Sequence, residues 1–377
     1  MSSFLSPYDR FEILRRIECV CLELCSQSLS GTSLTLSIQH PLSHQIKVIT
    51  THVSNSIITL GHVLRILNRI YNSVLHASPA TLRALYYQNK DLFKKQSHSN
   101  LALSLCSQLL RVRRPLTLIF ATARGIVYGD LRIYDQNHNL IGETKTKRSP
   151  HGLRISDGLA FTRGLTFESS PQKQQPQFIL VVEKEAVFNA ICEQILSKEK
   201  EGALVTPFVL MSGNGMPSLS SREFLRVLQA NLKIPVLGLF DCNPDGLGVM
   251  LTYMYTTDSS INSIGWVQYR NDYTIDEMYW LGVNTQHLKK EARHRGLREE
   301  DLNSIASGTH SQRDLSRFQT LLSHPKLQGN KNNSTRIEIK KMQTMGCKFE
   351  IDQISYTGTI LNLVEHAVKQ KQYILIS

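Results

Sequence analysis

Residues 178–188 read FILVVEKEAVF, residues 207–228 read PFVLMSGNGMPSLSSREFLRVL, and residues 235–246 read PVLGLFDCNPDG. Each stretch contains a short apolar run with the length of a buried parallel strand, at Phe178–Val182, Pro207–Met211 and Pro235–Phe240. Polar or glycine residues and then a helix-like segment follow each run, which is the pattern of βαβ units with right-handed crossovers. The sequence therefore predicts an α/β domain with a mostly parallel sheet.

Acidic and amide side chains follow two of these runs. Glu183 ends the first run, Asp241 ends the third, and Asn243 comes two residues later, whereas the second run ends in the glycine turn at 213–215. In open α/β sheets the ligand crevice lies outside the carboxyl ends of the strands, so the topology places these side chains at one edge. Carboxylate and amide oxygens are the ligands that Mg²⁺ prefers. Each residue alone is equally typical of a helix N-cap or a turn.

The bulk properties fit a globular protein with a polyanionic partner. The chain has 377 residues, 41% of them hydrophobic, and a formal net charge of +12. Nucleic acid and an anionic membrane surface both suit that charge. The seven cysteines have no regular spacing, which favours a reducing compartment. No run approaches about 18 apolar residues, so we expect neither secretion nor a membrane span.

The N-terminal half has the pattern of a helical domain that ends in β structure. An amphipathic helix is expected at 9–28, and loop or short strands at 31–51. Three helices followed by a small hairpin indicate a winged-helix (CAP-like) arrangement, which usually binds duplex DNA. The expected helices are 57–74, 82–88 (with Thr81 as N-cap) and 100–110, and the expected strands are 116–121, 125–129 and 131–134.

Composition divides the chain into four parts. We expect an N-terminal amphipathic helix and variable region at 1–54, the winged-helix domain at 55–168, a linker at 169–177, and the α/β domain with C-terminal helical elements at 178–377. The linker, SSPQKQQPQ, has no apolar residue and two prolines. The basic run Lys145–Arg148 is equally consistent with a phosphate-contacting or nuclear-import segment and with a solvated loop. A further strand is expected at 264–268, and helical segments at 336–345, 348–354 and 361–371.

Three motifs of the α/β domain resemble the signatures of the Toprim domain, which occurs in topoisomerases, primases and some nucleases. They are Val181–Lys184, Ser212–Pro217 and Asp241–Gly246. The resemblance implies one or two Mg²⁺ ions for phosphoryl transfer. The chain departs from the pattern because Asn243 replaces the usual third acid, and because Asn214 and Ser218 stand in the glycine turn.

The segment TLRALYY, residues 81–87, supplies a candidate nucleophile. Arg83 and Tyr87 are four residues apart, so they share one face of a helix. A tyrosine, with a pKa near ~10, is a poor nucleophile at neutral pH. A guanidinium one turn away and a metal-bound phosphate would favour the phenolate. Without such context, adjacent tyrosines on a helix are usually packing residues.

A Thr-x-Arg-x-x-Tyr-Tyr motif upstream of a Toprim-like domain strongly resembles the A subunit of topoisomerase VI. More narrowly, it resembles the eukaryotic meiotic DNA double-strand-break proteins derived from that subunit. The resemblance covers about residues 55 to 377 and includes the motifs Arg124–Gly129, Ser221–Leu225, Trp280–Gly282 and Lys348–Ile351. It implies that Tyr87 is the catalytic nucleophile, that Arg83 positions the phosphate, and that Glu183, Asp241 and Asn243 occupy the metal-ligand positions.

The same resemblance implies a type IIB topoisomerase-like, Mg²⁺-dependent transesterase that acts in the nucleus on double-stranded DNA. It implies breaks that initiate meiotic recombination, each strand ending in a 5′-phosphotyrosyl link. The implied assembly is a homodimer, or a heterodimer with a paralogue, that shares its active sites and binds a partner like the topoisomerase VI B-subunit but no membrane. Because Asn243 removes one negative charge, we expect weaker Mg²⁺ binding. One alternative stays open, a catalytically weakened DNA-binding paralogue that scaffolds the break-forming complex, whereas the tyrosine motif disfavours a water-using Toprim nuclease.

Overall fold

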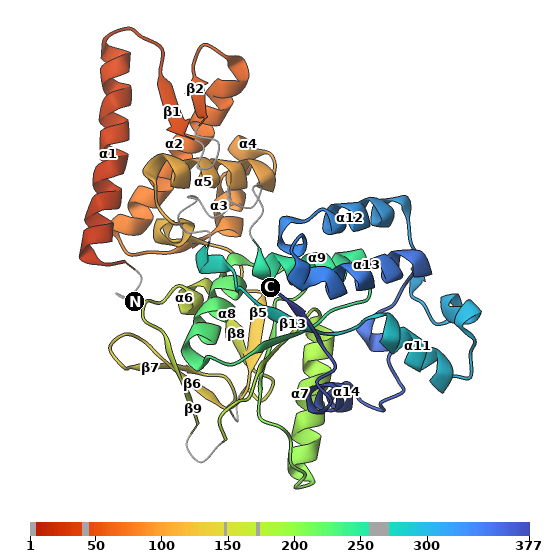
Figure 1. Cartoon of the computed structure of the whole chain (residues 1–377). Helices are drawn as coiled ribbons and strands as arrows, with labels where there is room; N and C mark the ends of the chain where they lie inside the picture. The colour runs from red at the N-terminus through yellow and green to blue at the C-terminus, as the bar shows by residue number, and fades with distance from the viewer. Residues whose placement is uncertain (1–4, 40–44, 147–148, 171–173, 256–270) are drawn as a thin grey trace. The chain divides into compact units, whose positions relative to one another are not determined.

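The computed structural model describes residues 5–39, 45–146, 149–170, 174–255 and 271–377 (Figure 1). The chain forms two compact units. The first comprises the described parts of Met1–Ala123, Ser156–Arg163 and Thr256–Tyr273, and the second comprises those of Arg124–Ile155, Gly164–Tyr255 and Thr274–Ser377. The strand expected at 264–268, Lys147 and Arg148 of the basic run, and residues 171–173 of the linker lie outside the described residues. The four-part division of the chain stays a prediction.

The first unit is mostly helical, and four helices occur where the sequence predicted them. Capping fixes the start of two of these helices. The side chains of Ser6 and Asp9 form a capping box before α1, and the Thr81 hydroxyl accepts a hydrogen bond from the Ala84 N–H, 3.0 Å long, at the start of α3. The elements are α1 (Pro7–Leu29), β1 (Thr35–Gln39), β2 (Ile46–Thr50), α2 (Ser54–Leu75), β3 (Ala80–Thr81), α3 (Leu82–Gln88), α4 (Lys90–Phe93), α5 (Gln96–Leu110), η1 (Arg114–Thr117), β4 (Ile119–Phe120) and α6 (Asp157–Ala160).

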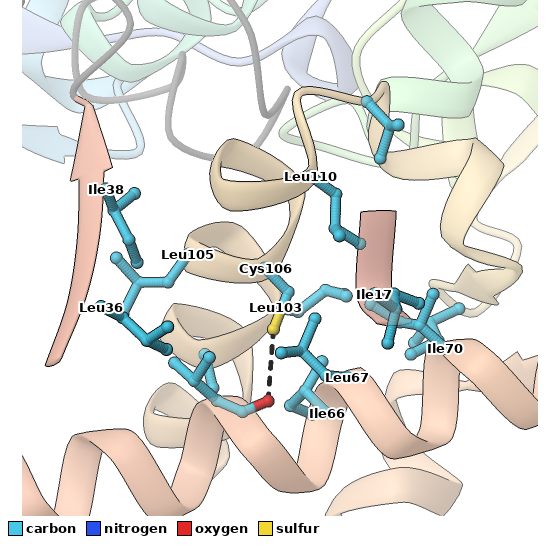
Figure 2. Packing of buried hydrophobic residues seen from close by; sticks show 14 of the residues in the cluster. Ile17, Leu36, Ile38, Ile66, Leu67, Ile70, Leu103, Leu105, Cys106 and Leu110 are labelled. Carbon is cyan, nitrogen blue, oxygen red and sulfur yellow. Dashed lines mark hydrogen bonds between the residues drawn. The ribbon is translucent and has the colours of Figure 1, made fainter. Parts of the chain in front are cut away.

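The core of this unit lies between α1, α2, α5 and β1 (Figure 2). Helix α1 contributes Ile17, α2 contributes Ile66 and Ile70, and α5 contributes Leu103, all of them buried. The buried thiol of Cys106 donates a hydrogen bond to the Val63 carbonyl at 3.5 Å, so even the polar atom in this layer has a partner. Helix α3 packs against this core, which holds the helix in place.

The second unit is organised around a seven-stranded sheet of order β16-β13-β12-β10-β11-β5-β8. Its four central strands, β13, β12, β10 and β11, run parallel, and the strands that flank them pair antiparallel. The predicted parallel core of the sheet is therefore confirmed. The strands are β5 (Gly125–Tyr128), β8 (Leu153–Ile155), β10 (Ile179–Val182), β11 (Val209–Ser212), β12 (Val236–Leu239), β13 (Met278–Gly282) and β16 (Ile374–Ile376).

The predicted hairpin between residues 125–129 and 131–134 is wrong. Strand β5 pairs with β11 and β8, whereas β6 (Leu131–Tyr134) pairs with β7 (Leu140–Glu143) and β9 (Thr166–Ser169) in a separate sheet. Burial explains the difference: all four residues of β5 are buried, as in an interior strand, while β6 is buried only at alternate positions. The winged-helix assignment of residues 55–168 stays a prediction.

Helices cover the sheet, and one predicted helix is absent. Helix α7 packs on β10 and β11, α14 packs on α7, and α12 packs on α9 and α13 (Figure 1). Residues 348–354, expected to be helical, form the end of a short strand, an isolated bridge and one 3₁₀ turn, because Phe349 pairs with Cys242. Within the described ranges, no helix is long and apolar enough to cross a membrane. The remaining elements are α7 (Glu185–Lys200), α8 (Leu219–Leu232), α9 (Pro244–Met254), α11 (Thr285–His294), η3 (Glu299–Ser304), β14 (Gly308–Thr309), α12 (Gln312–Leu322), η4 (Pro325–Leu327), η5 (Asn330–Asn332), α13 (Asn333–Met345), β15 (Cys347–Lys348), η6 (Ile351–Gln353) and α14 (Ile360–Lys369).

Candidate functional site

Two acidic residues meet at the carboxyl ends of β10 and β12. These strands are parallel neighbours with Val182 opposite Leu239, so the residues that follow them leave the sheet side by side. The backbone N–H of Asp241 donates a hydrogen bond to Oε2 of Glu183 at 3.0 Å. The structure therefore brings together Glu183 and Asp241, 58 residues apart in sequence.

The Asp241 side chain is held on both of its oxygens. It is 3% exposed. Its Oδ1 accepts a hydrogen bond from the Ile351 N–H at 2.9 Å, and its Oδ2 lies 3.0 Å from the Lys184 ammonium. A carboxylate fixed in this way is preorganised and has little freedom to reorient.

The environment disfavours two negative charges at this place. Burial, and then the nearby Asp241 carboxylate, raise the pKa of Glu183 to about 7. Burial also raises the pKa of Asp241. A buried and a partly buried carboxyl group with raised pKa values are the electrostatic setting that a divalent cation would relieve.

Asn243 has a structural role that is visible in the hydrogen bonds. It is the N-cap of α9, where its Oδ1 accepts the Gly246 N–H at 2.8 Å, and it is 9% exposed. Gly246 is required for close packing, since a Cβ atom there would lie 2.6 Å from the Asp241 carbonyl oxygen and 2.9 Å from Oε2 of Glu183. An amide oxygen has two lone pairs, so the cap leaves one acceptor position on Asn243.

The glycine turn packs against the same edge of the sheet. The Gly215 N–H donates to the Glu183 carbonyl at 2.8 Å, and the Asn214 side-chain amide donates to Glu185 Oε2 at 2.8 Å. Asn214 has a positive φ of 56°, a conformation that asparagine tolerates better than most residues. Asn214 thus shapes the turn and is tied to an acid.

Sequence reasoning missed Lys184, Glu350 and Asp352 as members of the site. The Lys184 ammonium binds Asp241 and also the carboxylates of Glu350 and, at 3.2 Å, Asp352. Its hydrogen bond lowers the pKa of Glu350. Lys184 and Glu350 each belong to a motif that carries the family resemblance, but only the fold shows that these two motifs meet.

The donor set fits a hard divalent cation. Within the described ranges, no group of three or more histidine, cysteine, aspartate and glutamate side chains is arranged to hold a metal ion. Glu183, Asp241 and the free acceptor position of Asn243 instead offer few protein oxygens, an arrangement that suits Mg²⁺, which keeps several waters and binds phosphates. The assignment of these three residues as metal ligands stays a prediction.

The tyrosine pair lies on α3 in the first unit. Tyr86 packs against the hydrophobic core, its ring lies 5.4 Å from that of Tyr87, and its hydroxyl donates to the Lys94 carbonyl at 3.3 Å. Tyr87 is 65% exposed, and Arg83, one turn earlier, is exposed as well. The helix thus packs one tyrosine, partly buried, against the core and presents the other, together with a guanidinium, to solvent.

Comparisons with known proteins identify the family of the chain. Residues 178–371 match the family model of the Toprim domain of topoisomerase 6 A-subunit/Spo11 proteins, and residues 59–116 match the model "Type IIB DNA topoisomerase". Meiotic recombination protein W68 of Drosophila melanogaster is 28% identical over 74% of this chain and 78% of its own length. Meiotic recombination protein SPO11 of Homo sapiens is 25% identical over 60% of this chain and 52% of its own length.

The A-subunit of DNA topoisomerase 6 from Arabidopsis thaliana is 28% identical over 60% of this chain and 48% of its own length. The chain thus spans about half the length of the human and Arabidopsis relatives and over three quarters of the Drosophila one. The Toprim model alone matches residues 178–371, more than half of the 377 residues. The chain therefore belongs to the family of topoisomerase 6 A-subunits and Spo11 proteins.

Proposed function

We propose that this protein cleaves double-stranded DNA by tyrosyl transesterification and so makes the breaks that initiate meiotic recombination. Family membership and the names of the relatives, meiotic recombination proteins among them, support the proposal. The observation that carries it is the exposure of Tyr87, since its neighbour Tyr86 is partly buried and packs against the core. A large aromatic side chain presented to solvent beside Arg83 is suited to meet a phosphate.

In the proposed reaction the Tyr87 hydroxyl oxygen attacks the phosphorus of a DNA phosphodiester. A bond forms between that oxygen and phosphorus, and the bond from phosphorus to the 3′ oxygen breaks. The tyrosine loses its proton, and the departing 3′ oxygen gains one, which leaves a 5′-phosphotyrosyl link and a 3′ hydroxyl. One phosphodiester replaces another, so the step needs no external energy source. Arg83 is proposed to bind the phosphate oxygens.

Glu183, Asp241 and Asn243 are proposed to hold Mg²⁺. When bound, the ion would neutralise charge on the phosphate and stabilise the charge that develops during displacement. The chain's own part is to keep two carboxylates converged at the strand ends, which the Asp241 N–H to Glu183 hydrogen bond and the close packing of Gly246 achieve. Ionised Glu183 is needed for this, and its pKa of about 7 makes ionisation partial at neutral pH without a cation.

The proposal includes a dimer in which Tyr87 of one protomer meets the acids of the other, formed by two copies or with a paralogue. Family membership supports this arrangement, and Tyr87 and Glu183 belong to different compact units of the chain. Double-stranded DNA, a partner like the topoisomerase VI B-subunit and a nuclear location complete the proposal, and the net charge of +12 suits the DNA.

Covalent capture of DNA tests the proposal. The protein is purified from meiotic cells under denaturing conditions, and any attached DNA is end-labelled. We expect label in the wild type and in a Tyr86→Phe control, and no label in Tyr87→Phe. Label in Tyr87→Phe would refute the nucleophile. Strand cutting without any adduct would favour a water-using nuclease, and no label in wild type while breaks occur would favour the scaffolding paralogue.

A further inference from the structure

A lysine sits inside the candidate metal site. The Lys184 ammonium lies 3.0 Å from Asp241 Oδ2 and 3.2 Å from Asp352 Oδ2, and it hydrogen-bonds Glu350 Oε2. The Lys184 side chain is only 28% exposed, so its charge is weakly screened by solvent. One cation is therefore shared between a proposed metal ligand and two acids from the C-terminal part of the chain.

The position of these two acids is built into the fold. Phe349 and Cys242 form a β-bridge with N–H to carbonyl distances of 2.7 and 3.3 Å, which places residues 350–352 directly beside Asp241. The Ile351 N–H then donates to Asp241. Farther along, the fully buried Glu291 accepts the N–H groups of Ser355 and Tyr356 at 2.7 and 3.0 Å and anchors the end of the segment.

An ammonium and a divalent cation compete for the same oxygen. Oδ2 of Asp241 is engaged by Lys184, so a metal ion that uses this oxygen must displace the ammonium or share with it. Glu350 and Asp352 offer the ammonium other partners and so weaken its hold on Asp241. Because opposite charges this close interact strongly where solvent is partly excluded, small changes in these partners should change cation affinity measurably.

We propose that Lys184 is a positioning residue that sets the charge of the metal site, and that Glu350 and Asp352 position Lys184. In this arrangement the lysine neutralises Asp241 while the cation is absent and gives way toward the C-terminal acids when it binds. The inference rests on the metal-dependent cleavage proposed above, but it concerns cation affinity and not the tyrosine. A purely structural alternative is that Lys184 only ties the 350–352 segment to β10.

The two roles of Lys184 predict opposite changes in Mg²⁺ affinity when the lysine is replaced by methionine. If Lys184 sets the charge, Lys184→Met removes a competing cation and tightens Mg²⁺ binding by at least about tenfold, whereas Glu350→Gln and Asp352→Asn leave the ammonium on Asp241 and weaken binding. If Lys184 is only a tie, all three substitutions loosen the segment and all three weaken binding. Lys184→Arg keeps the charge and should retain affinity closer to that of the wild type than Lys184→Met does.

The measurement is calorimetric titration of Mg²⁺ into the full chain, with folding of each variant verified by circular dichroism. Lys198→Met is the matched control, because Lys198 also pairs with an acid, Glu365 at 2.7 Å, and has a similarly covered side chain in the same unit. It should leave Mg²⁺ affinity unchanged. Weakened or absent binding in Lys184→Met overturns the inference, as does tightening in the control of the same size.

The two experiments distinguish failure of the charge-setting role of Lys184 from failure of the proposed DNA cleavage. If Lys184→Met tightens Mg²⁺ binding while Glu350→Gln and Asp352→Asn weaken it, and no Tyr87-dependent DNA adduct forms, the charge-setting role of Lys184 is kept and cleavage is refuted. A Tyr87-dependent adduct together with weakened Mg²⁺ binding in Lys184→Met would do the reverse.

Discussion

Replacing Glu183 by glutamine should stabilise the metal-free protein at neutral pH. In the folded chain, burial and the adjacent Asp241 raise the pKa of Glu183 from 4.5 to about 7. Because each tenfold change in proton affinity is about 1.36 kcal/mol, ionising this carboxyl in the folded state costs about 3.4 kcal/mol more than in the unfolded chain. Glutamine is neutral and nearly isosteric, and its side-chain oxygen can still accept the Asp241 N–H.

Because the pKa of Glu183 is raised on folding, the stability gained by Glu183→Gln depends on pH in a defined direction and range. A carboxyl whose pKa is raised on folding favours the folded state fully below pH 4.5, and this contribution is lost as the pH rises through about 7. The stability gained by Glu183→Gln should therefore be about 0.8 kcal/mol at pH 5 and about 3.3 kcal/mol at pH 8. Saturating Mg²⁺ should reduce the difference in unfolding free energy between Glu183→Gln and the wild type at pH 8, because the wild type gains stability from a ligand that the variant binds poorly.

Urea denaturation in the presence of EDTA, followed by tryptophan fluorescence at pH 5 and pH 8, measures both values. Glu277→Gln serves as the control, since Glu277 is exposed in the same unit and its replacement should change stability little at either pH. An equal gain at the two pH values would trace the effect to packing and not to charge. A variant less stable than the wild type at pH 8 would refute the electrostatic reasoning altogether.

Three further substitutions test the site and its supports. Asn243→Asp should keep the α9 cap and tighten Mg²⁺ binding; unchanged affinity in calorimetry would argue that residue 243 is no ligand. Gly246→Ala should destabilise by about 1–3 kcal/mol in thermal unfolding and weaken Mg²⁺ binding, because its Cβ would lie 2.6 Å from the Asp241 carbonyl oxygen and 2.9 Å from Glu183; a neutral result would mean that this packing is relaxed. Thr81→Ala should cost about 1 kcal/mol of unfolding free energy by removing the α3 cap, whereas Thr81→Ser should not, and equal losses in both would exclude the cap as the cause.

The parts of the fold that the sequence predicts well are those with a local physical signal. The apolar run at 178–182 is fully buried and forms a strand because both of its faces are covered, and the neighbouring runs behave in the same way. Helix α3 begins at Leu82, directly after the capping hydroxyl of Thr81. Since these strands are parallel, their order also predicted that Glu183 and Asp241 would converge, and the hydrogen bond between them bears this out.

The parts that could not be predicted depend on contacts between distant segments. Strand β5 and the segment after it were expected to pair because they are adjacent in sequence, but burial on both faces takes β5 into the large sheet. The link between Lys184 and Glu350 joins residues 166 positions apart. A lysine after a strand and an acid near a C-terminus are ordinary surface residues in a sequence, and only the Phe349–Cys242 bridge makes them neighbours.

Asn243 shows why a motif alone leaves its role undecided. The residue types that cap helices best include aspartate and asparagine, and oxygen-donating side chains of the same types bind Mg²⁺. At the end of β12, where α9 begins, Asn243 is seen to cap the helix, with the Gly246 N–H on one acceptor position of its oxygen, while its role as a metal ligand stays a prediction. Exchange of aspartate for asparagine preserves the cap fully and removes only charge, so the fold exerts no pressure against it. We therefore expect the cost of that exchange to fall on the proposed cation binding, where Lys184 already offsets the negative charge of Asp241.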